Sequence, residues 1–152
     1  MNLIELYQKK GLSFFPLRKK SKKPLFDWAV YQERKPTQAE VDEWREKGLL
    51  DQVAIVCGAV SGIIVLDVDD PEKFEAWRTQ NGHSMPPTPM VRTSGGKYHV
   101  YFKHPGGRVK NSVKKIPGAD IKADGGYVVA PPSIHPTTGE PYEWVEFMGL
   151  DA

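Results

Sequence analysis

Two aspartates separated by one residue, Asp67 and Asp69, have the type and spacing for metal-dependent chemistry. They stand at the end of an apolar run that predicts a strand over residues 63–68. Successive side chains of a strand alternate between its two faces, so both carboxylates should project from one face, about 7 Å apart. They would repel each other unless a cation lies between them, and carboxylate oxygens suit Mg²⁺ or Mn²⁺. The alternative is a plain strand end entering solvent, because short motifs often match by chance.

A second polar set surrounds a glycine pair. The sequence predicts a hairpin over residues 90–103 whose turn contains Gly95 and Gly96. Lys97 and His99 should share one face of its second strand, opposite an apolar face that packs on the core. Glycine lets backbone amides approach a phosphate, and both side chains can donate to phosphate oxygens. The alternatives are an ordinary hairpin turn and a surface histidine.

A third set lies in the predicted strand 119–122, where Asp120 and Lys122 share a face. The Asp124-Gly125-Gly126 segment that follows is typical of a turn, so we expect Asp124 to form the turn rather than bind a metal. The three sets together place acids, bases and amide donors on one side of their strands.

Hydrophobic spacing and turn residues predict the elements that position these sets. Helices are expected over residues 2–10, from a capping box at Thr37 to about Gly48, and from Asp70 to Gly82. Asp70 precedes a proline, which is typical of an N-cap, so we leave it outside the metal site. Strands are expected at residues 13–17, 53–57, 63–68, 90–93, 98–103, 119–122, 127–130 and 142–146. Helices in the first half and strands in the second predict an α+β fold whose sheet has one free face.

Composition and charge narrow the class of protein. The 152 residues suit one domain, and 13 prolines with 14 glycines argue against a helix bundle. The net charge of +2 hides basic runs at residues 18–23 and 97–115 and an acidic cluster at 67–75. These runs are either solvated loops or the flanks of a phosphate-handling site. The lone Cys57 excludes an internal disulfide and a cysteine zinc framework, and no apolar run could cross a bilayer, so we expect a cytoplasmic protein.

The ordered motifs resemble a known family, the primase-polymerase (prim-pol) domain of the archaeo-eukaryotic primase superfamily. This is the N-terminal domain of bifunctional DNA primase/polymerases, found in phage, plasmid and integrated-element replication proteins. The resemblance is carried, in order, by residues 58–69, 94–102, 119–122, 125–133 and 139–144 and by the early Lys23-Pro24 and Trp28. It implies a single catalytic domain with an N-terminal α/β unit (about 1–60) packed on an RRM-like catalytic sheet (about 61–152), within a longer replication protein.

The resemblance also implies the roles of particular residues. The catalytic set is Asp67, Asp69, His99 and Asp120, of which the three aspartates bind Mg²⁺ or Mn²⁺. Nucleotide binding is expected at Ser94, Gly95, Gly96, Lys97, His99 and Lys122. The family often has Ser-x-His where this sequence has Lys97 two residues before His99, so Lys97 should contact the triphosphate. Template phosphates are expected at Arg108, Lys110, Lys114 and Lys115, unless this stretch is a solvated loop. No zinc is expected.

Three functions fit these residues. The first is template-dependent nucleotidyl transfer from a dNTP or NTP to a DNA primer, as a primase or polymerase. The second is a nucleotide- or nucleic-acid-binding module that needs partner domains, and the third is a metal-dependent nuclease. The first accounts for all the motifs in their order. We expect a helicase or helical priming domain in the same or a partner protein, no membrane partner, and weak primer initiation by this chain alone.

Overall fold

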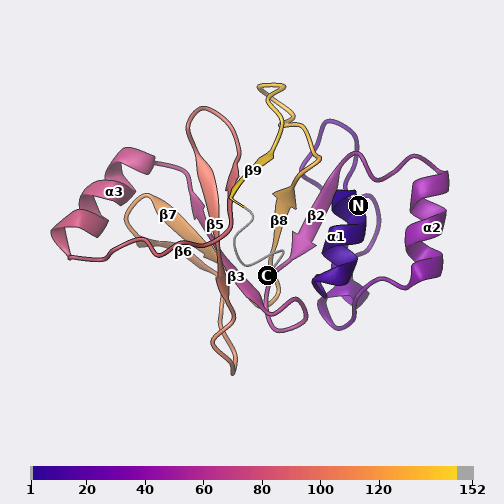
Figure 1. The fold of residues 1–152 in the computed structure, drawn as a ribbon, viewed down its shortest axis with the longest axis horizontal. Helices are drawn as coiled ribbons and strands as arrows, with labels where there is room; N and C mark the ends of the chain where they lie inside the picture. Colours follow the sequence, from indigo (N-terminus) through magenta and orange to yellow (C-terminus); the bar gives the residue numbers. More distant parts are fainter. Residues whose placement is uncertain (1, 147–152) are drawn as a thin grey trace.

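Two antiparallel β-sheets form the centre of the computed structural model, which describes residues 2–146 (Figure 1). The small sheet has the order β1-β2-β8 and the large one the order β6-β7-β3-β5-β4-β9. The small sheet contains β1 (Phe14–Pro16), β2 (Val53–Val56) and β8 (Tyr127–Ala130). The large sheet contains β3 (Ile63–Val68), β4 (Met90–Arg92), β5 (Tyr98–Lys103), β6 (Ser112–Ile116), β7 (Ala119–Lys122) and β9 (Glu143–Glu146). With its separate helices, this architecture confirms the predicted α+β fold class.

Two of the helices begin at the caps that the sequence predicts, Thr37 and Asp70. The helices are α1 (Leu3–Lys9), α2 (Gln38–Glu46) and α3 (Pro71–Gln80), with a short 3₁₀ helix, η1 (Ala29–Gln32), in a segment for which the sequence predicted neither a helix nor a strand. The capping box of α2 is complete, because Thr37 Oγ1 accepts from the amide of Glu40 and the Glu40 carboxylate accepts from the amide of Thr37. Asp70 caps α3 by accepting from the amide of Lys73 at 3.1 Å, as predicted.

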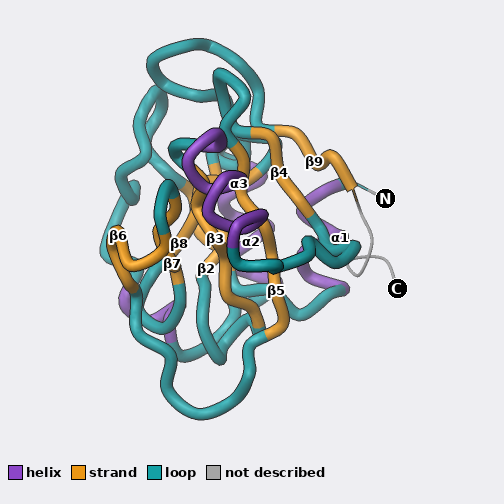
Figure 2. Tube along the Cα trace, turned by 90° about the vertical axis from the view of Figure 1, so that its left-hand side faces the viewer, coloured by secondary structure: helices purple, strands orange, loops and turns teal. Residues whose placement is uncertain are grey.

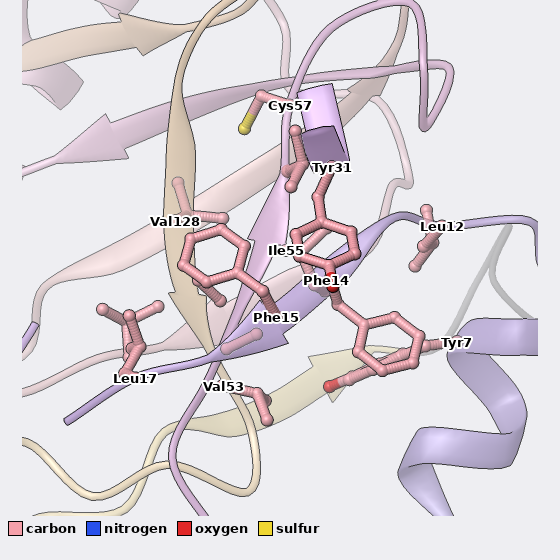
Figure 3. Close-up of a cluster of buried hydrophobic side chains, with 14 of the residues drawn as sticks. Tyr7, Leu12, Phe14, Phe15, Leu17, Tyr31, Val53, Ile55, Cys57 and Val128 are labelled. Atoms are coloured by element: carbon pink, nitrogen blue, oxygen red, sulfur yellow. The ribbon is translucent and has the colours of Figure 1, made fainter. Parts of the chain in front are cut away.

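The larger hydrophobic core surrounds the small sheet. Aromatic side chains from several elements pack there, and Figure 3 shows Phe14, Phe15, Tyr7 and Tyr31 beside Ile55 of β2. Phe14 and Phe15 are fully buried, so both faces of β1 are covered. A smaller cluster of Val68, Phe74, Val100 and Ala119 lies between the large sheet and α3.

The two faces of the large sheet have different neighbours. Its even-numbered β3 side chains, such as Val68, face α3, which lies in front of the strands in Figure 2. On the other face, Val65 and Tyr101 pack into the core of the small sheet. The small sheet therefore covers only part of that face, and Asp67 lies in the next same-face position beyond Val65.

Two features of the sheets go beyond the sequence prediction. The basic stretch before residue 116 contains an edge strand, β6, which was not predicted. Strand β8 was predicted as a strand, but it pairs with β2 of the small sheet rather than with strands of the large sheet. The division into parts of about 1–60 and 61–152 stays a prediction.

Candidate active site

The register of three strands brings the site together around Asp67. Asp67 of β3 lies opposite His99 of β5 on one side and opposite Asp120 of β7 on the other. Directly opposite residues of an antiparallel pair project from the same face with Cβ atoms about 5 Å apart. Lys122 lies opposite Val65, one position along on that face. The structure thus gathers on one face residues from all three predicted sets.

His99 and Asp67 are direct neighbours. The Nε2 atom of His99 lies 3.4 Å from Oδ1 of Asp67. Burial alone would raise the pKa of the Asp67 carboxyl group, but the contact with His99 and the charge of Lys122 outweigh it and lower that pKa. Within residues 2–146, the buried Nδ1 atom of His99 has no hydrogen-bond partner. His99 is therefore oriented by its contact with Asp67 and keeps one ring nitrogen unused.

His99 is more buried than the sequence suggested. It lies on the predicted face, but only 6% of its surface is exposed. Tyr142, which precedes β9, lies beside it with ring centroids 6.3 Å apart. The local hairpin pattern contains no information about this distant tyrosine, which is why the histidine was expected on an open surface.

Asp69 lies close enough to both other aspartates to sense their charge. Burial, then Asp67 and Asp120, raise the pKa of Asp69, and Lys97 opposes this shift. A cation among these carboxylates would relieve their repulsion. Within residues 2–146, no group of three or more His, Cys, Asp and Glu side chains is arranged to hold a metal ion by itself. Because Mg²⁺ often takes one or two carboxylates together with substrate phosphates, the aspartates fit a site that the substrate completes.

A hollow of about 300 Å³ beside these carboxylates is lined by a lysine that the sequence analysis did not select. Asp69 and Asp120 line it together with Lys73 from the first turn of α3. The charged helix start was visible in the sequence, but its position next to β7 was not.

The predicted glycine turn has the expected backbone. Gly95 and Gly96 have φ values of 56° and 81°, in the left-handed region that favours glycine. The amide of Lys97 donates to the carbonyl oxygen of Ser94 at 2.9 Å, and the side chain of Lys97 is exposed. Ser94 is 6% exposed. The Gly95 amide faces the Glu140 carboxylate at 3.3 Å, so this turn offers a donor that already attracts an anionic group.

Asp124 lies apart from the three aspartates Asp67, Asp69 and Asp120, and its side chain links two loops by hydrogen bonds. Its carboxylate accepts from the amides of Ala59 at 2.9 Å and Val109 at 2.8 Å, and these bonds lower its pKa. His104 lies 3.3 Å from the same carboxylate. This structural role agrees with the expectation that Asp124 is not a metal ligand.

The predicted template-binding residues are divided between two places. Arg108 lies in the loop after β5 and lines a hollow with Asp124, and Lys110 lies nearby in a bridge to that residue. Lys114 and Lys115 belong to β6, next to Ile116, which pairs with Ala119 at the carboxylate end of the sheet. Only the β6 residues are therefore near the site, and DNA binding by this set stays a prediction.

The loop between β8 and β9 supplies further residues that the sequence reasoning missed. His135 stacks on Tyr142, with ring centroids 5.9 Å apart and an interplanar angle of 21°. Burial and the charges of Lys22 and Lys97 lower the pKa of His135. The sequence shows a polar turn between His135 and Tyr142. It does not show that this turn lies next to His99, which Tyr142 contacts.

Comparison with known protein families agrees with this geometry. The family model described as "Bifunctional DNA primase/polymerase, N-terminal" (Prim-Pol) matches residues 4–149, which is nearly the whole chain. This match confirms the resemblance inferred from the order of the motifs. A comparison with curated proteins found no match. Across residues 2–146, no helix is both long and apolar enough to span a membrane.

Proposed function

Because the chain belongs to the bifunctional DNA primase/polymerase N-terminal family, we propose that it transfers a nucleotidyl group from a dNTP or NTP to the 3′-hydroxyl of a template-paired primer. Family membership makes it a primase/polymerase-type nucleotidyl-transfer domain. The main structural support for transfer to a primer 3′-hydroxyl is the strand register, in which Asp67 lies between His99 and Asp120. This arrangement places acidic and basic groups around one point, as phosphoryl chemistry requires.

The three aspartates are the proposed metal ligands. Asp67, Asp69 and Asp120 would hold Mg²⁺ or Mn²⁺ together with the phosphates of the incoming nucleotide, since their carboxylates influence one another. When bound, such ions lower the pKa of the attacking hydroxyl and neutralise charge on the phosphate. His99 would position Asp67 through the contact with its Oδ1 atom.

The cations and amides of the same face would position the substrate. Lys97 is exposed at the glycine turn, where it can reach the triphosphate, and Gly95 and Gly96 provide backbone amides. Lys122 would add positive charge near Asp67, whose pKa it already helps to lower. These residues act by positioning and by electrostatic stabilisation rather than by covalent catalysis.

The test is extension of a labelled primer on a DNA template with dNTPs and Mg²⁺ or Mn²⁺. Asp67→Asn should lower extension about 100-fold or more, because it removes a charge that faces the reacting phosphates. The control, Asp42→Asn, removes an aspartate on α2 whose side chain is 60% exposed, and should extend like the wild type.

Other outcomes select the other functions. Nucleotide binding in a calorimeter without turnover would indicate a binding module that needs partner domains. Cut DNA or released phosphate without extension would indicate a metal-dependent nuclease. Extension of a primer without robust initiation would agree with the proposal that a helicase or helical priming domain assists this chain. A cytoplasmic location stays a prediction of the sequence.

A further inference from the structure

Two adjoining hollows lie outside the carboxylate site, between the loop after β1 and the loop after β8. One hollow of about 520 Å³ is lined by Lys19, Leu25 and other residues, and a second of about 330 Å³ is lined by His135 and its neighbours. Both hollows share Lys20, Gln52 and Ile134, so they adjoin, and we call the two together the groove. Figure 1 shows the two loops beside each other at the same end of the molecule.

The basic loop that forms one wall has a fixed backbone. A bridge joins Leu17 to Pro24, and the amide of Arg18 donates to the carbonyl oxygen of Lys23 at 2.9 Å. The hydroxyl of Tyr127, on β8, donates to the carbonyl oxygen of Lys22 at 2.9 Å. The backbone that carries these lysines is therefore anchored to the small sheet.

The charges of this loop are available to a ligand. Its five basic residues are all exposed: Arg18, Lys19, Lys20, Lys22 and Lys23. No ion pair found among residues 2–146 involves any of them. Asp51 is an acid in the lining of the first hollow, so the positive charge clearly exceeds the negative. Such a surface is complementary to a chain of phosphates.

The groove also has an apolar wall. Leu25 is 36% exposed and Ile134 is 46% exposed, although both are large hydrophobic residues. Single-stranded nucleic acid has both phosphates and flat apolar bases, and its binding grooves combine cations with apolar or aromatic side chains.

The groove continues toward the catalytic face. His135 lines its second hollow and stacks on Tyr142, which lies beside His99. Gln52 holds this connection, because its side chain accepts from the amide of Ile134 at 2.8 Å and donates to the carbonyl oxygen of Ile134 at 3.2 Å.

We propose that this groove binds a single strand of nucleic acid and leads it to the face that contains Asp67. The route of the strand to Asp67 rests on the proposed function. The binding of the strand rests only on the charge and the apolar surface of the groove. It also assigns strand binding to residues 18–25 and 134–139, which are distinct from the basic stretch 108–115.

The test measures binding of a fluorescein-labelled oligothymidylate to the whole chain as a function of salt. Lys19, Lys20 and Lys22 are changed together to glutamine. The control changes Lys9, Lys35 and Lys47, which are also exposed, to glutamine and so removes the same charge from other surfaces. Circular dichroism checks that both variants fold.

The groove variant should bind at least about tenfold more weakly at low salt, whereas the control should stay within about twofold of the wild type. The magnitude of the slope of log K against log salt should fall by about 2, since each lost phosphate contact to a single strand contributes about 0.7 to it. Ile134→Ala should weaken binding with an unchanged slope, because it removes apolar contact and no charge. Equal binding by the groove variant and the control would overturn the proposal.

Primer extension by the same proteins separates this proposal from the proposed function. If the wild type binds the oligonucleotide through these lysines but incorporates no nucleotide, the groove stands and the proposed function is wrong. If the wild type extends primers and the groove variant binds and extends like the control, the function stands and the groove is wrong.

Discussion

Gly118 lies in the turn between β6 and β7 and is hydrogen-bonded to the segment between β3 and α3. Its substitution should therefore disturb the carboxylate site. Its carbonyl oxygen accepts from the amides of Asp69 at 3.0 Å and Asp70 at 3.1 Å. Its φ of 78° is left-handed, and an added Cβ atom would lie 2.8 Å from the amide nitrogen of Phe74 and against the carbonyl oxygen of Asp70. Both contacts are with backbone atoms, so the start of α3 and the strand end containing Asp69 must move.

The structure allows the cost to be separated into two parts. The left-handed backbone costs an alanine about 1 kcal/mol. The clash adds about 1–3 kcal/mol, as for overpacking of a filled site. Gly107→Ala is the matched control, because Gly107 also has a left-handed φ, of 67°, and its added Cβ would have no atom within 4 Å.

The assay is urea unfolding followed by tryptophan fluorescence, together with primer extension well below the melting temperature. Gly118→Ala should be less stable than Gly107→Ala by about 1–3 kcal/mol. It should also extend primers more slowly, because Asp69 and Asp120 line the hollow beside Gly118. Equal stability of the two variants would refute the reasoning about the clash, and full activity in Gly118→Ala would refute the coupling to the site.

Two further changes test other parts of the molecule. The carboxyl group of Glu40 has a pKa of about 2, mainly because Arg34 donates to it. Because this pKa is below its unfolded value of about 4.3, the stabilisation is complete above that value and is lost as the pH falls toward 2. Glu40→Gln should therefore flatten the acid limb of a stability-against-pH curve by about 1 kcal/mol, a figure reduced for solvent screening; an unchanged acid limb would contradict this. Lys97→Ala should raise KM for the nucleotide about tenfold with less effect on kcat, if Lys97 binds phosphate before and during the reaction; steady-state kinetics with Lys103→Ala, which removes an exposed lysine at the other end of β5, provides the control.

Local patterns in the sequence predicted candidate residues for the site, whose functional roles stay predictions, but they did not predict how the strands bring those residues together. Strand alternation predicted that Asp67 and Asp69 share one face, because side-chain direction within a strand depends only on the strand itself. In the structure β3 ends at Val68, one residue before Asp69. That Asp67 lies between His99 and Asp120 depends on strand order, in which β3 is inserted between β5 and β7. Strand order follows from long-range packing, which no window of residues describes.

The missed features have similar physical origins. Strand β6 lies in a stretch that reads as a solvated loop, and it forms as an edge strand that pairs with β7 on one side only. Tyr142 covers His99 from a position far along the chain, so the exposure of His99 was predicted too high. In both cases the local pattern contained no information about the distant segment that packs there, which is β7 for β6 and Tyr142 for His99.

The pairing of β8 with β2 has a consequence for how this molecule can be divided. The chain leaves the large sheet after β7, adds β8 to the small sheet, and returns to the large sheet as β9. The backbone therefore passes from one sheet to the other and back, and we expect the two sheets to unfold in a single cooperative transition. A fragment ending near residue 60 would lack β8 and would expose the hydrogen-bonding edge of β2, which invites association with other copies. Exchange of parts with a related protein should accordingly transfer β2 and β8 as a pair.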